Sequence, residues 1–330
     1  MFKKLNLIWL PLALSIFGVY AIQRGFATFA KSADFVIPHM KDALGIYFTV
    51  MSIVVLIGGY LLDNYKSKNL FLIAGGLGAA GLILVPYTPW AFGLLFGSAA
   101  ALLKLGPYSA PMKLYNENES FKICPQAAAK NLGGAAFILF LGGFLTTLGW
   151  IPTSVLLAGF FLTSCVLSYL MLPDDKIEGW KWDQFIELSK SLKFWFLMLY
   201  FFIMCGVYYV AIYNLYPALT SYGIAKGTAL TILAISYIIC GALRWPAAWI
   251  GNRYRVTSMW VGTAGMALAI PLLNFNAIAG LILFTLSSAV HTPNYWAYVK
   301  EQWGPKYIAT IVGLGFFFMY LGAGVMYGQW

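Results

Sequence analysis

The sequence predicts an all-α membrane protein that crosses the bilayer many times. Hydrophobic residues make up 61% of its 330 residues, whereas charged residues make up only 10%. A soluble domain carries about 25% charged residues, so this chain has too few charges to cover a surface that faces water. Its apolar stretches are about 20 residues long and do not alternate with polar residues, which favours helices over barrel strands.

The apolar stretches predict eleven transmembrane helices. Each stretch is long enough to cross about 30 Å of hydrocarbon, and most connections are too short to hold a soluble domain. The first stretch is too long for the apolar part of a signal peptide, so we expect it to remain as the first span. The expected spans are residues 7–30, 43–62, 69–87, 90–112, 126–148, 151–172, 194–217, 227–250, 257–273, 275–294 and 307–329.

Lysine and arginine residues fall mainly on one side of these spans. Fourteen lie on the side of the N-terminus, and only Lys31, Lys41 and Lys226 lie on the other. This asymmetry predicts a cytoplasmic N-terminus, and we expect a multi-pass protein of the bacterial inner membrane. Because the charges follow topology, the net charge of +10 does not indicate a nucleic-acid partner. We expect the lipid bilayer as its surroundings and a monomer as its state.

One connection is longer and polar, and it separates six spans from five. It predicts an N-terminal bundle over residues 1–173, a cytoplasmic linker over 174–193 and a C-terminal bundle over 194–330. Trp182, Ile186 and other apolar residues in the linker suggest a short amphipathic helix on the membrane surface. A solvated linker with incidental aromatic residues is the alternative.

The two sets of spans contain an internal repeat. Three pairs of matching residues occur in the same order, at separations of 189, 186 and 180: Asp63 with Asn252, Pro107 with Pro293, and Gly133 with Gly313. Such a repeat predicts two structurally equivalent halves. It also predicts a twelfth span after Trp330.

The end of the second span resembles a loop motif of the major facilitator transporters, Gly-x-x-x-Asp-Arg-x-Gly-Arg-Arg. Gly59 and Asp63 match the motif, whereas Lys66 stands where the family has its second glycine. The second copy keeps Arg253 but has Asn252 in place of the aspartate. The resemblance implies two bundles with the substrate between them near the midplane. It also implies that these five residues belong to the loops that hold the inward-closed state.

None of the eleven acidic residues lies near the middle of a predicted span. Proton coupling through a buried carboxylate requires such a residue, and cation or metal substrates favour carboxylate oxygens. Both types of transport are therefore disfavoured, and we expect neither a metal nor a cofactor. The sequence shows no catalytic triad or phosphate-binding loop, so we do not expect an enzyme.

Two arginines lie inside predicted spans. Arg24 lies about two thirds of the way through the first span, where exposure to lipid would cost several kcal/mol. We expect Arg24 to face a central cavity; the alternative is that it reaches the outer interface. Arg244 lies about 12 Å from the cytoplasmic end of the eighth span, eight residues before Asn252. That depth is too great for Arg244 to reach the interface easily.

The surroundings of three basic residues resemble the anion-transporting branches of the same superfamily. Arg244, Trp245 and Pro246 resemble the span-eight arginine and proline of oxalate–formate antiporters and nitrate/nitrite porters. Arg24 occupies the span in which organophosphate:phosphate antiporters carry a phosphate-binding arginine. Lys130 precedes Asn-Leu-Gly-Gly, where those antiporters have a histidine before a similar motif. The resemblance implies that Arg24, Arg244 and Lys130 bind an anion. The alternatives are a structural pairing or a lipid headgroup as the partner of Arg244, and a place at the cytoplasmic mouth for Lys130.

Other polar residues give weaker signals. Tyr209, Tyr213 and Tyr216 share one helical face, and the hydroxyls of Tyr209 and Tyr213 are candidates to orient an anion. His291 is a candidate for the substrate-binding site and for titration during transport; the alternative, a hydrogen-bonded packing role, is the favoured interpretation. Lys104 is expected to extend to the interface.

These observations favour a secondary active or facilitative transporter for a small anion, such as an organic acid, a phosphate ester or an inorganic anion. Without a buried carboxylate, exchange or facilitated diffusion is the expected mode. The alternatives are an efflux transporter of lipophilic compounds and a membrane scaffold or assembly subunit that transports nothing.

Overall fold

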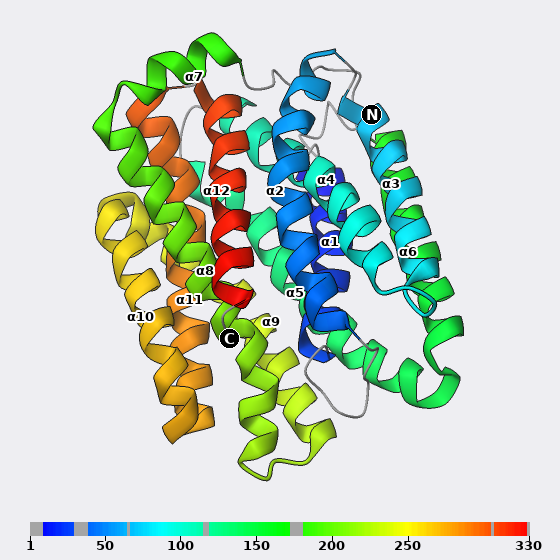
Figure 1. The fold of residues 1–330 in the computed structure, drawn as a ribbon. Helices are drawn as coiled ribbons and strands as arrows, with labels where there is room; N and C mark the ends of the chain where they lie inside the picture. Colours follow the sequence, from blue (N-terminus) through cyan, green and yellow to red (C-terminus); the bar gives the residue numbers. More distant parts are fainter. Residues whose placement is uncertain are drawn as a thin grey trace.

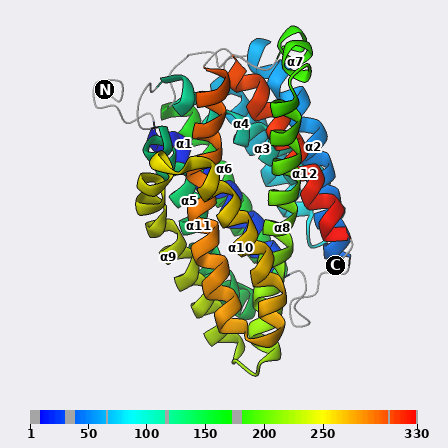
Figure 2. The ribbon, with the colours of Figure 1, turned by 90° about the vertical axis from the view of Figure 1, so that its left-hand side faces the viewer.

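The computed structural model describes residues 9–29, 39–64, 67–114, 119–171, 181–304 and 307–328. Over these ranges the chain is helical, with short turns between the helices and no strand. Figure 1 shows long helices lying side by side. The turned view in Figure 2 shows that they run along roughly one direction, as helices that cross a bilayer must.

The first half contributes six long helices, each at the place of a predicted span. A π-helical turn, η3 (Phe92–Phe96), leads directly into the fourth of them. The bounds are α1 (Trp9–Phe29), α2 (Met40–Asn64), α3 (Ser67–Leu84), α4 (Gly97–Leu114), α5 (Glu119–Leu148) and α6 (Trp150–Met171).

The linker contributes one short helix, α7, and the second half contributes five long ones. The bounds are α7 (Trp182–Ser189), α8 (Leu192–Ser221), α9 (Lys226–Arg253), α10 (Arg255–Phe275), α11 (Ala277–Trp303) and α12 (Ile308–Gly328). The described part of the chain thus holds eleven long helices, one at the place of each predicted span, which confirms the predicted all-α fold.

Helix α7 lies across the end of the bundle at which α8 begins, at the top of Figure 1. It is tied to α12 by the hydroxyl of Thr310, which donates a hydrogen bond of 2.6 Å to the side chain of Gln184. Trp182 and Ile186 on α7 are exposed. The preceding linker residues 174–180 lie outside the described residues.

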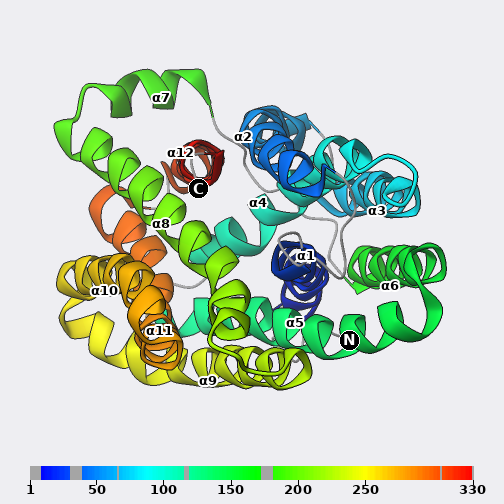
Figure 3. The same cartoon turned by 60° about the horizontal axis from the view of Figure 1, so that its bottom comes forward.

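Two helix pairs make the most extensive contacts between the halves: α5 packs along α9, and α2 packs along α12. Both pairs lie side by side in Figure 3. The sequence repeat makes α2 equivalent to α9 and α5 equivalent to α12. Exchanging the halves therefore turns one pair into the other, so the interface has the pseudo-twofold symmetry of a parallel repeat.

Glycines allow close approach within equivalent helix pairs of the two halves, α1 with α5 and α8 with α12. A methyl group on Gly133 of α5 would collide with the carbonyl oxygen of Phe17 in α1. A methyl group on Gly322 of α12 would likewise collide with the carbonyl oxygen of Phe202 in α8. Small residues let helix backbones approach closely in membranes, so the glycines of the repeat determine how each half packs.

By length and composition, four helices in the described part of the chain suit a membrane crossing: α6, α8, α9 and α10. Shorter apolar helical stretches occupy residues 42–58, 68–84, 92–105 and 310–326. Many large apolar side chains lie on the outside, including Phe140, Trp249 and Leu170. A soluble monomer rarely exposes so much continuous apolar surface, and lipid accounts for it.

Candidate functional site

Five basic side chains from five helices are buried around the centre of the molecule. They are Arg24 on α1, Lys104 on α4, Lys130 on α5, Arg244 on α9 and His291 on α11, and none is more than 7% exposed. In the described part of the chain, no aspartate or glutamate is buried. Burying a charged group without a counter-charge is costly, so this cluster of bases is the candidate functional site.

Arg24 turns into the protein and does not extend to the outer interface. Its Nη2 donates a hydrogen bond to the hydroxyl of Tyr208 on α8. Its guanidinium carbon lies 4.5 Å from the ring centre of Tyr237 on α9. Gly134 makes room for this side chain, because a Cβ there would stand 2.5 Å from the Cδ of Arg24.

Lys130 lies between two aromatic rings. Its Nζ is 4.3 Å from the ring centre of Tyr208 and 4.9 Å from that of Tyr20. At these distances an ammonium group is attracted to the negative face of the ring. Lys130 thus shares Tyr208 with Arg24 and belongs to the same cluster.

Lys104 does not extend to the interface, so that expectation was wrong. Its side chain is fully buried, and its Nζ donates a hydrogen bond of 2.9 Å to Oε1 of Gln23. Nε2 of Gln23 in turn donates a hydrogen bond of 2.6 Å to the hydroxyl of Tyr209. The ring centres of Tyr20 and Tyr320 lie 4.3 and 4.7 Å from Nζ. Lys104 is therefore a member of the central cluster that the sequence did not single out.

Arg244 is fully buried, and its hydrogen-bonding capacity is largely unused. Its Nη2 makes only a weak contact of 4.0 Å with Sγ of Cys240, one turn earlier on α9. Among the described residues, its Nε and Nη1 have no hydrogen-bond partner. Arg244 lies within electrostatic range of Lys130 and His291. A guanidinium has a planar fork of donors that fits a carboxylate or phosphate, and here most of that fork is unoccupied.

The tyrosines of α8 divide into two groups. Tyr209 receives the hydrogen bond of Gln23, and Tyr213 packs against it with ring centres 5.7 Å apart. Tyr208 makes the contacts with Arg24 and Lys130. Helical spacing favoured the face of Tyr209 and Tyr213 and missed Tyr208. Tyr208 and Tyr209 are consecutive, so they place hydroxyls on two different faces of α8. That pair was the signal in the sequence that could have identified Tyr208.

His291 is packed among aromatic and hydroxyl groups. Its ring stacks against that of Tyr295 at 5.8 Å, and Oγ1 of Thr292 lies 3.2 Å from its Nε2. Such surroundings suit the packing role given above as the alternative. His291 nevertheless reaches the same cavity as Lys130.

The cavity at this centre is very small. Tyr20, Lys130, Cys205 and His291 are among the residues that line it, and its volume is about 20 Å³. A space of this size holds about one water molecule. All five bases are at most 7% exposed, so the two halves are closed on each other around them.

Side chains of the loops that match the transporter motif are described only in the second half. Arg255 donates hydrogen bonds to Oδ1 of Asn252 at 3.3 Å and to Oε2 of Glu301 at 2.5 Å, which joins α9 and α10 to the end of α11. Arg253 lies over the ring of Tyr254 at 5.6 Å. In the first copy, the side chains around Gly59 and Asp63, and Lys66 itself, lie outside the described residues.

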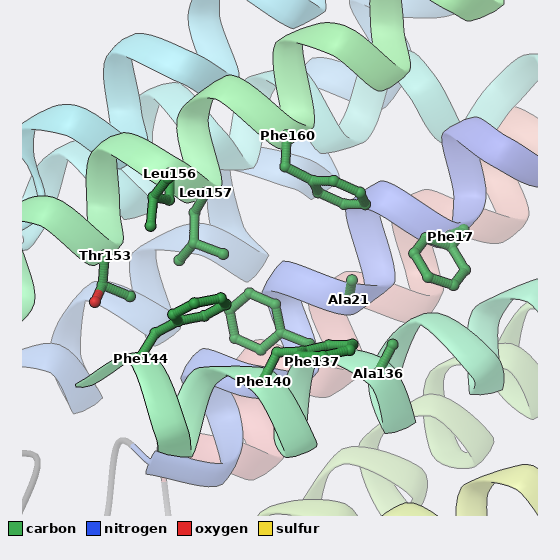
Figure 4. Close-up of a pocket in the computed structure, with 10 residues that line it drawn as sticks. All are labelled: Phe17, Ala21, Ala136, Phe137, Phe140, Phe144, Thr153, Leu156, Leu157 and Phe160. Atoms are coloured by element: carbon green, nitrogen blue, oxygen red, sulfur yellow. The ribbon is translucent and has the colours of Figure 1, made fainter. Parts of the chain in front are cut away.

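Two larger pockets are apolar and lie away from the basic cluster. One, of about 320 Å³, lies between α1, α5 and α6 and includes Phe17, Phe140 and Phe160 (Figure 4). The other, of about 520 Å³, includes Leu132 and Trp245. Phe140, Phe160, Leu132 and Trp245 are all exposed on the apolar surface, so both pockets face lipid.

Comparison with known proteins yields one family and one fold. A sequence profile of the Major Facilitator Superfamily matches residues 126–327, more than half of the chain. The crystal structure of the E. coli fucose:proton symporter FucP is similar, with a TM-score of 0.67 and 17% sequence identity over 96% of this chain and 89% of that chain. At that identity the likeness shows the fold alone. No curated protein matches the sequence.

Proposed function

Because this chain belongs to the major facilitator superfamily and is a multi-pass membrane transporter, we propose that it carries a small anion by alternating access. The cargo class is an organic acid, a phosphate ester or an inorganic anion. The two bundles, residues 1–173 and 194–330, would rock about the central basic cluster, and the linker 174–193 would join them. We propose a monomer in the bacterial inner membrane with a cytoplasmic N-terminus.

Arg244 is the observation that supports the anion most directly. It is fully buried, two of its nitrogens have no hydrogen-bond partner among the described residues, and no acid is buried in that part of the chain. Leaving a buried donor unpaired costs about 1–3 kcal/mol, and more for a charged group. An anionic ligand would recover that cost.

The other residues have supporting roles in this proposal. Arg24 and Lys130 would add positive charge beside Arg244, and Tyr209, Tyr213 and His291 would shape and orient the bound anion. Asp63 with Gly59 and Lys66, and Asn252 with Arg253, would act at the cytoplasmic loops that open and close between states.

A flux measurement in proteoliposomes tests the proposal. Radiolabelled oxalate, phosphate and glycerol 3-phosphate would each be offered to the wild-type protein and to Arg244→Gln. We expect at least one anion to be transported, and its flux to fall about 100-fold in Arg244→Gln, because truncating one partner of a buried charge pair costs about 2–5 kcal/mol.

The matched control is Lys226→Gln, which removes one positive charge from the exposed start of the same helix. Its flux should equal that of the wild type. If an anion is transported at the same rate by Arg244→Gln as by the wild type, Arg244 is not its ligand and the proposal fails.

One observation also favours a second candidate, the scaffold that transports nothing. That function predicts a centre too narrow for solute, and the cavity here measures about 20 Å³. A carrier between its two open states has the same feature. Flux distinguishes the two, because a scaffold moves none of the three anions and binds a stable partner in the membrane.

A further inference from the structure

Three basic side chains of the first half each contact a tyrosine of the second half. Arg24 donates to the hydroxyl of Tyr208, and Lys130 lies 4.3 Å from the centre of the same ring. Lys104 lies 4.7 Å from the ring centre of Tyr320 on α12. These contacts cross the interface between halves at the cavity where the proposed anion would bind.

The tyrosines supply negative charge density without an acid. The face of an aromatic ring attracts a cation, and the attraction is strongest where water is excluded. Water is nearly excluded here, since the cavity holds about one molecule. The rings of Tyr208 and Tyr320 are themselves buried, with 2% exposure each.

We infer that Tyr208, Tyr237 and Tyr320 take the place of the anion when the site is empty, and so allow the empty carrier to close. This inference rests on the proposed function. Without these rings Arg24 would lose Tyr208 and Tyr237. Among the described residues, the two lysines would keep only partners of their own half, such as Tyr20 and Gln23. Closure of the empty protein would then be too costly, and the carrier would close only with an anion bound. Such a carrier performs strict exchange. With the tyrosines as substitute partners, it also performs net one-way transport.

Arg244 makes closure of the empty form less favourable than closure of the loaded form. Its Nε and Nη1 have no hydrogen-bond partner among the described residues of the closed protein. Net transport should therefore be slower than exchange but measurable. In this view the tyrosines determine whether net transport occurs, and Arg244 determines the ratio of the exchange rate to the net transport rate.

Labelling of Cys205 tests closure without any substrate. Cys205 lines the cavity and is 6% exposed. A protein that retains only this thiol, with Cys124, Cys165 and Cys240 replaced by alanine, would be treated with the anionic reagent sulfonatoethyl methanethiosulfonate. In this background we expect Tyr208→Leu to react about tenfold faster, the factor that corresponds to one desolvated cation–ring contact.

Tyr200→Leu is the matched control, because Tyr200 lies on the same helix and is equally buried at 2%. Its hydroxyl contacts Met259 and Thr263 within its own half, so labelling should stay at the background rate. Tyr208→Phe keeps the ring and loses the hydroxyl, so its labelling rate should lie between those of the background protein and Tyr208→Leu. Tyr320→Leu repeats the test from α12 if Tyr208→Leu does not fold. Background rates in both leucine variants would overturn the inference.

Transport of oxalate, phosphate and glycerol 3-phosphate supplies the second test. For each anion the wild type carries, we expect both counterflow exchange and net efflux into buffer without anion. In Tyr208→Leu the ratio of net efflux to exchange should fall about tenfold, whatever the change in exchange itself. Exchange without net efflux in the wild type would overturn this inference and leave the proposed function intact. If the wild type shows neither exchange nor net efflux of any of the three anions, both this inference and the proposed function are overturned.

Discussion

Arg244→Gln is expected to melt at a higher temperature than the wild type when no anion is present. The guanidinium is fully buried, and its Nε and Nη1 have no hydrogen-bond partner among the described residues. Replacing it by a neutral amide removes the cost of burying an uncompensated charge, which is several kcal/mol per ion. Even about 1 kcal/mol shifts Tm by about 2–4 °C in a domain of 150–250 residues.

When an anion is added, the wild type should melt at a higher temperature than Arg244→Gln. A ligand at 100 times its Kd stabilises the folded state by about 2.7 kcal/mol, so the wild type should gain several degrees in oxalate, phosphate or glycerol 3-phosphate. Arg244→Gln should gain almost nothing. Thermal unfolding in detergent, followed by tryptophan fluorescence, measures both effects.

Two further variants make this result specific. Lys226→Gln makes the same change of charge at an exposed site and should behave as the wild type. Arg244→Lys keeps the charge but lacks the planar fork of donors, so it should respond to anions only weakly. The role of Arg244 is contradicted if Arg244→Gln melts below the wild type without anion and still responds fully to an anion.

Gly133→Ala is expected to destabilise the first half and to displace Arg24. The added methyl would collide with the carbonyl oxygen of Phe17 in α1, and a backbone atom cannot rotate away. The two helices must separate, at a cost of about 1–3 kcal/mol for overpacking. Arg24 lies seven residues beyond Phe17, about 10 Å further along α1, so its contact with Tyr208 should be disturbed. We expect a lower Tm and a smaller stabilisation by anion.

Gly159→Ala provides the comparison. Gly159 lies on α6, and no atom stands within 4 Å of the position its Cβ would take. Alanine is favoured over glycine inside a helix by about 1 kcal/mol, so this variant should be as stable as the wild type or more stable. Equal Tm values for Gly133→Ala and Gly159→Ala would show that the α1–α5 approach does not constrain the protein.

The sequence predicted most of the buried basic residues of the site, but not the side chains that they contact. The burial of Arg24 and Arg244 was expected from their depth in apolar stretches, because lipid cannot solvate them. Lys130 was singled out only by its resemblance to a family motif. Lys104 was assigned to the interface, since a lysine stem is long enough to reach it. That assignment failed because Gln23 on α1 and Tyr320 on α12 supply partners inside the protein. Such partners come from distant parts of the chain, and no local pattern identifies them.

The sequence by itself determined that the protein lies in lipid, that it forms eleven long helices, and that these helices carry bases but no acids near their middles. These properties follow from transfer of each segment into hydrocarbon, which depends on composition and length alone. Only the tertiary structure decided which side chains meet at the centre. The rotation of each helix about its axis depends on close contacts such as that of Gly133 with Phe17. That rotation places Tyr208 against Arg24 and leaves the donors of Arg244 unoccupied among the described residues.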